Sequence, residues 1–66
     1  MLGSRPIYEK IEKFDACESS PFDFWYLQLF TNAEPNEPSY VVMNEYGQVG
    51  CLAWQEQGAR DWIAKN

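Results

Sequence analysis

The chain has 66 residues, with ten acidic and five basic side chains, no histidine and a net charge of −5. That length allows a single small acidic domain, residues 1–66, with one modest core, and excludes a deep substrate cleft between two domains. The negative charge argues against direct binding to nucleic acid or to an anionic membrane. No stretch approaches the roughly 18 apolar residues that a membrane-spanning helix needs.

The first periodic segment, residues 5–14, predicts an amphipathic helix. Ile7, Ile11 and Phe14 recur at i, i+4 and i+7, which aligns them on one helical face. Ser4 is a candidate N-cap. Pro6, in the first turn, has no backbone N–H that would be left without an acceptor.

Residues 22–30 are dense in aromatic and branched side chains and predict a strand with two apolar faces. Alternation puts Phe24, Tyr26, Gln28 and Phe30 on one face and Trp25, Leu27 and Leu29 on the other. The polar ends of Tyr26 and Gln28 tolerate water, which favours exposure of the first set. The opposite arrangement, with Phe24 and Phe30 in the core, stays open.

Residues 31–39 contain two prolines and two asparagines and predict a loop. After it, residues 40–44 and 49–53 predict a hairpin, in which Asn44 opens a type I turn and Gly47 adopts the left-handed conformation. The predicted cross-strand pairs are Met43 with Val49 and Val41 with Cys51.

The last segment, residues 55–66, predicts a second helix, with Ala59, Trp62 and Ile63 on one side. The expected fold is therefore α+β in the order α-β-β-β-α, a three-stranded antiparallel sheet with two helices packed on one face. The strands supply apolar residues to both sheet faces, so we expect the second face to be an exposed patch or to be covered by another chain.

The residue types that support catalysis are scarce. Without histidine, the Ser-His-Asp and Cys-His arrangements and imidazole metal ligation are excluded, and no glycine-rich phosphate loop is present. Cys17 and Cys51 are expected to be reduced thiols that cannot form a zinc site. We therefore expect a protein that is not an enzyme and has no catalytic, cofactor or metal site. The first ten residues lack the apolar core of a signal peptide, so we expect a cytoplasmic location.

The charges are unevenly distributed along the chain. All five basic residues fall in the two predicted helices, and every charged side chain in residues 14–59 is acidic. This layout predicts an acidic rim around an aromatic sheet face, suited to a partner with a basic surface. The candidate partner-binding residues are Phe24, Tyr26, Phe30, Glu34, Glu37, Glu45 and Tyr46.

The expected order α-β-β-β-α is similar to that of the double-stranded-RNA-binding domain. The basic stretch that opens the last helix of that family would fall at residues 55–60, which read QEQGAR here. That departure removes the phosphate contacts, so the family's activity is not carried over. In its small size, acidity and aromatic content, the chain also resembles the small inhibitors of bacteriophages, anti-CRISPR proteins among them.

The functional hypothesis is a non-enzymatic protein-binding inhibitor or adaptor that occludes a basic, nucleic-acid-handling surface of a larger partner. One alternative is a self-associating structural or regulatory subunit, a homodimer through the open sheet face. A further alternative is a weak nucleic-acid-binding domain that uses the basic residues of its helices.

Overall fold

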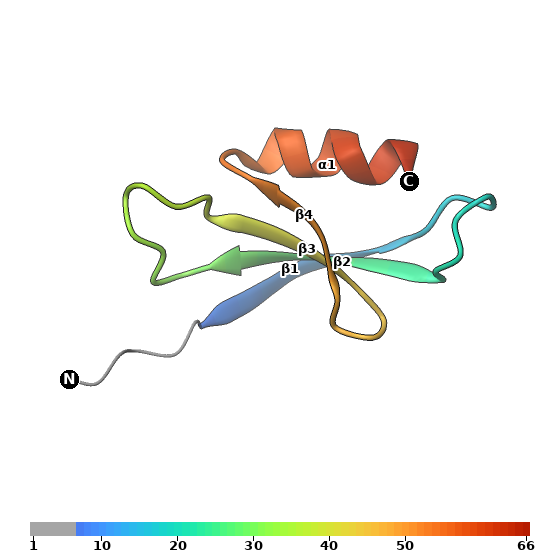
Figure 1. Ribbon diagram of the computed structural model, residues 1–66, viewed down its shortest axis with the longest axis horizontal. Coiled ribbons are helices and arrows are strands. Elements are labelled where there is room, and N and C mark those ends of the chain that lie inside the picture. The colour runs from blue at the N-terminus through green and yellow to red at the C-terminus, as the bar shows by residue number, and fades with distance from the viewer. Residues whose placement is uncertain (1–6) are drawn as a thin grey trace.

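The computed structural model describes residues 7–66, which form a four-stranded sheet followed by one helix. The elements are β1 (Tyr8–Asp15), β2 (Phe24–Phe30), β3 (Tyr40–Asn44), β4 (Val49–Ala53) and α1 (Glu56–Lys65). All neighbouring strands are antiparallel, in the spatial order β1-β2-β3-β4. The helix lies along one face of this meander (Figure 1).

The prediction of a first helix over residues 5–14 is wrong, because the described part of that segment is strand β1. The expected α-β-β-β-α order, with three strands and two helices, is therefore also wrong, and the topological likeness to the double-stranded-RNA-binding domain ends with it. The predicted N-cap at Ser4 and the proline at position 6 lie outside the described residues.

A β-bulge in β1 explains why this strand looked helical in the sequence. The pairing of β1 with β2 shifts between Lys10 and Glu12, so Ile11 has no partner opposite it. A bulge adds one residue to one strand and changes the local repeat on a face from two residues to three. Side chains three positions apart then share a face, as they do on a helix.

The core lies between α1 and the sheet. Trp25 and Leu27 of β2 and Val42 of β3 pack there with Ala59 and Ile63 of the helix. Leu27 and Val42 are completely buried, and each such side chain contributes about 1.5–3 kcal/mol to stability. The helix contacts β2, β3 and β4, which leaves β1 at the margin of this layer.

The hairpin turn between β3 and β4 agrees with the sequence prediction. Gly47 has φ +80°, and its N–H donates to the carbonyl of Asn44 at 3.0 Å. The Asn44 side chain is buried, and its Oδ1 accepts the N–H groups of Tyr46 and Gln48 at 2.8 and 3.0 Å. These bonds satisfy the polar groups of the turn and fix its conformation.

The hairpin register is only half as predicted. Met43 pairs with Val49 as expected, but Cys51 pairs with Val42 and not with Val41. A second register shift, between Val42 and Met43, skips one residue of β4 and moves the pairing by one position.

The other predicted elements are confirmed within one or two residues: β2 begins at Phe24 and α1 runs from Glu56 to Lys65, with residues 31–39 as a connection between strands. In residues 7–66, no helix has the length and apolar character needed to cross a membrane.

Gly50 allows two tryptophans to pack against the backbone of β4. The rings of Trp25 and Trp62 meet edge to face, with centroids 4.8 Å apart. A Cβ atom added at Gly50 would lie 2.7 Å from a ring carbon of Trp25 and 2.8 Å from one of Trp62. Both contacts are far shorter than van der Waals separations, so the tryptophan pair requires glycine at this position.

We predict opposite effects for two glycine-to-alanine substitutions. Gly50→Ala forces the two tryptophan rings apart and should lower the free energy of unfolding by about 1–3 kcal/mol. Gly58→Ala, in the exposed first half of α1, places its Cβ in ordinary contact at 3.8 Å and should raise that free energy by about 0.5–1 kcal/mol. Urea denaturation of both variants tests the prediction, and equal effects would contradict this packing.

Candidate functional site

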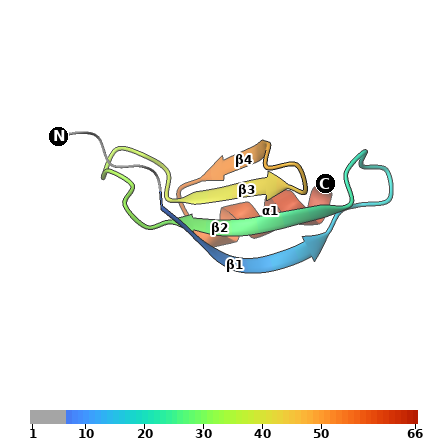
Figure 2. The ribbon, with the colours of Figure 1, turned by 90° about the horizontal axis from the view of Figure 1, so that it is seen from below.

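The sheet face turned away from α1 is the main candidate site, and we call it the open face. Figure 2 views the sheet from this side, with the strands in front of the helix. Among residues 7–66, no other helix or strand lies over it. Its side chains, assigned from the strand pairing, are Tyr8, Lys10, Lys13, Asp15, Phe24, Tyr26, Gln28, Phe30, Val41, Met43, Val49 and Leu52.

The open face is largely apolar and partly packed on itself. Val41 lies at its middle, paired with Gln28 and Leu52, and is only 3% exposed although it is not part of the helix-side core. Side chains of the open face must therefore cover it. Leu52, at the β4 edge, is 57% exposed.

Four aromatic rings line the β1–β2 half of this face. Phe24, Tyr26 and Phe30 project from β2 and are half-buried. Tyr8 of β1 pairs with Phe30 in the sheet, and their ring centroids lie 5.3 Å apart. The structure thus brings together the three aromatic residues of β2 that the sequence singled out and adds a fourth.

Two lysines of β1 lie over these rings. The Lys13 ammonium is 3.8 Å from the centroid of the Phe24 ring and 5.9 Å from that of Tyr26. The Lys10 ammonium is 4.4 Å from the Tyr26 centroid. At exposed positions, such cation–π contacts contribute about 0.5–1 kcal/mol each, so they orient the lysines without fixing them.

The bulge in β1 sorts its charges between the two sheet faces. Lys10 and Lys13 pair with Gln28 and Tyr26 on the open face. Glu9 and Glu12 pair with Leu29 and Leu27, so they project on the helix side. There, Arg60 of α1 donates to the Glu12 carboxylate at 3.0 Å.

This arrangement corrects the expected charge layout. Lys10 and Lys13 belong to a strand and not to a helix, so the sheet is not purely acidic. Within the four strands, the open face carries these two lysines and Asp15, a net charge of +1 (2 − 1), and the helix side carries Glu9 and Glu12, a net charge of −2.

The predicted acidic rim is divided between the two ends of the sheet. Glu34 and Glu37 lie in the β2–β3 connection, and Glu45 lies in the β3–β4 turn at the other end (Figure 1). Their contacts are local. Glu37 Oε1 accepts the N–H of Glu34 at 3.0 Å, and the Glu45 carboxylate accepts the N–H of Asp23 at 3.2 Å and that of Phe24 at 3.4 Å.

The hydrogen bonds of Glu45 affect its ionisation. Desolvation by its surroundings raises the pKa of the Glu45 carboxyl, but the N–H donors of its own backbone, Asp23 and Phe24 outweigh that effect. The pKa is therefore lowered from its ordinary value, since these donors favour the charged form. Glu45 holds the start of β2 against the hairpin turn.

Tyr46 lies apart from the open face. It is 73% exposed, and its ring meets that of Phe22 at a centroid distance of 6.4 Å. Phe22 in turn packs against the buried core residue Trp25. Tyr46 thus joins the aromatic group on the helix side and does not extend the row formed by Phe24 and Tyr26.

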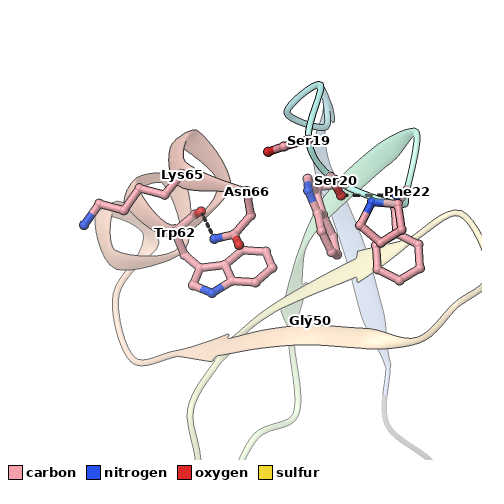
Figure 3. Close-up of a pocket in the computed structure, with 9 residues that line it drawn as sticks. Ser19, Ser20, Phe22, Gly50, Trp62, Lys65 and Asn66 are labelled. Carbon is pink, nitrogen blue, oxygen red and sulfur yellow. Dashed lines mark hydrogen bonds between the residues drawn. The ribbon is translucent and has the colours of Figure 1, made fainter.

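A pocket of about 360 Å³ lies between the end of α1, β4 and the β1–β2 connection (Figure 3). Its walls include Phe22, Trp25 and Trp62. Polar side chains in its walls form hydrogen bonds within the protein. The Asn66 side chain donates to the carbonyl of Trp62, and the Ser20 hydroxyl accepts the N–H of Phe22. None of its lining side chains is a carboxylate or a histidine that could act as a general base.

The two cysteines lie in different environments. A hydrogen bond with the Ser19 hydroxyl lowers the pKa of the exposed Cys17 thiol, and burial raises that of Cys51. Both thiols are free. In the part of the chain that the structure describes, no three potential ligands cluster to hold a metal ion.

No protein-family model, curated protein or solved structure matches this chain. The interpretation as a phage-type inhibitor resembling anti-CRISPR proteins is withdrawn. The fold consists mostly of strands with a single helix, and no relative supports such a function.

Sequence reasoning missed Tyr8, Lys10, Lys13 and Gln28 as members of the candidate site. The signal for the two lysines was present in the segment EKIEK, residues 9–13, where each glutamate and each lysine recurs after three positions. That repeat fits a helix, but it also fits a strand with one bulge.

We predict that Glu45 stabilises the fold in a pH-dependent way. A carboxyl whose pKa is lowered by folding adds stability above its ordinary pKa, about 4.3, and loses that contribution as the pH falls through the lowered value. Glu45→Gln should therefore reduce the free energy of unfolding at neutral pH, and this reduction should become progressively smaller below pH ~4. Denaturation from pH 7 to pH 3, with Glu18→Gln as the control, measures this effect. A deficit that does not change with pH would contradict it.

Proposed function

We propose that this protein is a non-enzymatic binding module that engages a partner macromolecule through the open face of its sheet. The observation that carries the proposal is the row formed by Tyr8, Phe24, Tyr26 and Phe30 on a face that α1 does not cover. Uncovered apolar patches on protein surfaces commonly mark binding sites.

The position of the lysines bears on the charge of the partner. A partner with a basic surface, the hypothesis drawn from the sequence, would meet Lys10 and Lys13 on the open face. Within the strands, Asp15 is the carboxylate that it would find on this face, and the predicted rim residues Glu34, Glu37 and Glu45 lie in connections at the two ends of the sheet. The geometry favours a partner that presents anionic groups to the open face. A cytoplasmic location remains a prediction.

Self-association through the open face is less well supported. A two-fold interface uses the same patch on both copies. Lys10 and Lys13 of each copy would then enter one buried interface, where like charges are unfavourable. Sedimentation at high micromolar concentration tests this alternative, and a monomer would remove it.

We predict that capture of a partner depends on Tyr26. The immobilised protein is exposed to a cell lysate, and both protein and nucleic acid are measured in the eluate. Tyr26→Ala should strongly reduce the retention of the bound species, because this ring lies between Phe24 and Phe30 in the row of rings on β2. Tyr46→Ala, which removes an exposed tyrosine away from that face, is the matched control. Equal retention by the wild type and Tyr26→Ala would contradict the proposal.

A further inference from the structure

We infer that the partner of the open face is a single-stranded nucleic acid, whose bases stack on the aromatic rings while its phosphates contact Lys10 and Lys13. The inference rests on the proposed binding role of this face and specifies the chemistry of the partner.

The spacing of the rings suits a series of bases. Phe24 and Tyr26 are neighbours on one face of β2, about 6.6 Å apart along the strand at ~3.3 Å per residue. Phe30 continues the row, with Tyr8 beside it. Bases of single strands stack on such side chains independently of sequence, because every base has a π-face. Gln28, between Tyr26 and Phe30, offers amide donors and an acceptor to base edges.

The lysines lie where phosphates would pass. Lys10 and Lys13 project from β1, the strand next to the ring-bearing β2, and their ammonium groups already reach the rings of Tyr26 and Phe24. Long side chains at exposed positions can turn from a ring to a phosphate at small cost, since each cation–π contact is weak. A nucleotide supplies both partners that this face needs, a flat ring and an anion.

The net charge of −5 does not prevent this interaction, because the charges are separated by face. On the open face, Lys10 and Lys13 outnumber Asp15, and the strand carboxylates Glu9 and Glu12 project on the helix side. At physiological salt, charges more than about 8 Å from the bound strand are largely screened. The local charge of the face therefore governs the contact, although two lysines give only a modest electrostatic contribution.

Other occupants fit the open face less well. An apolar protein surface would bury two ammonium groups, and lysine is depleted in the cores of protein interfaces. An anionic membrane would meet rings that are half-buried in the pleat of the sheet and unable to insert deeply. A nucleic-acid duplex keeps its bases stacked within the helix and away from the rings.

The test measures fluorescence anisotropy with a labelled mixed-sequence oligonucleotide of about 12 nucleotides, within the range bound by single small domains. Binding of single-stranded DNA, of single-stranded RNA of the same sequence and of the matching duplex is compared at physiological ionic strength. We expect binding of one or both single strands, which identifies the nucleic acid, and much weaker binding of the duplex.

Two pairs of variants test the mechanism. Tyr26→Ala should weaken binding roughly five- to 150-fold, the effect of losing one stacked base, while Tyr46→Ala should leave it unchanged. Lys13→Gln should reduce the slope of log K against log salt by about 0.7, the value for one phosphate contact on a single strand. Lys65→Gln, which removes the same charge from the end of α1, should not change the slope. Tyr26→Leu keeps apolar bulk without a flat ring, so it distinguishes loss of stacking from loss of folding.

Absence of single-strand binding would overturn the inference, and so would binding that is unchanged in Tyr26→Leu or that prefers the duplex. An effect of Lys65→Gln equal to that of Lys13→Gln would overturn the phosphate assignment. If oligonucleotides do not bind but capture of a protein still depends on Tyr26, the inference fails and the proposed function stands. If capture does not depend on Tyr26 either, both fail.

Discussion

The structure depends on one constraint: a single ten-residue helix covers only one face of a four-stranded sheet. Ala59 and Ile63 of α1 complete the core around Leu27 and Val42, and Trp62 extends it to Trp25 over the glycine of β4. Within residues 7–66, no helix or strand covers the opposite side, so the side chains there must be stable without such a layer. The aromatic and aliphatic side chains there shield one another only in part, as the buried Val41 beside the exposed Leu52 illustrates. A chain of this length has few large apolar side chains, and most of its buried ones lie on the helix side of the sheet.

The bulge at Ile11 determines which charged side chains of β1 lie on the open face. In a regular strand, Lys10 and Lys13 would project on opposite sides, because three positions is an odd number in a period of two. The extra residue brings both onto the open face and both neighbouring glutamates onto the helix side. Glu12 then pairs with Arg60, whose guanidinium also lies 5.5 Å from the centroid of the Phe14 ring, so Arg60 connects the helix to β1. One irregularity therefore connects the outer strand to the core and places two cations among the aromatic rings.

Much of the fold follows from the sequence wherever one local signal dominates. The aromatic strand, the Asn44–Gly47 turn and the last helix were predictable because alternation, turn chemistry and helical periodicity each point to a single structure. Residues 7–14 were not, because a bulged strand and an amphipathic helix share a three-residue spacing, and only pairing with β2 decides between them. That error also affected the predicted charge layout. With Lys10 and Lys13 assigned to a helix, all charged side chains of the sheet and its connections appeared to be acidic. The aromatic part of the candidate site could be predicted, but its basic part depended on long-range contacts.

The central claim, that β1 is a bulged strand carrying both lysines over the rings of β2, is tested most directly by nuclear magnetic resonance of the free protein. The account predicts cross-strand contacts between β1 and β2. It also predicts upfield ring-current shifts for the terminal methylene protons of Lys10 and Lys13, with proton–proton contacts to the rings of Tyr26 and Phe24. Helical contacts between residues three positions apart over 7–14, without lysine–ring contacts, would contradict it. In that case the open face would lose its cations, and the nucleic-acid inference would lose its basis.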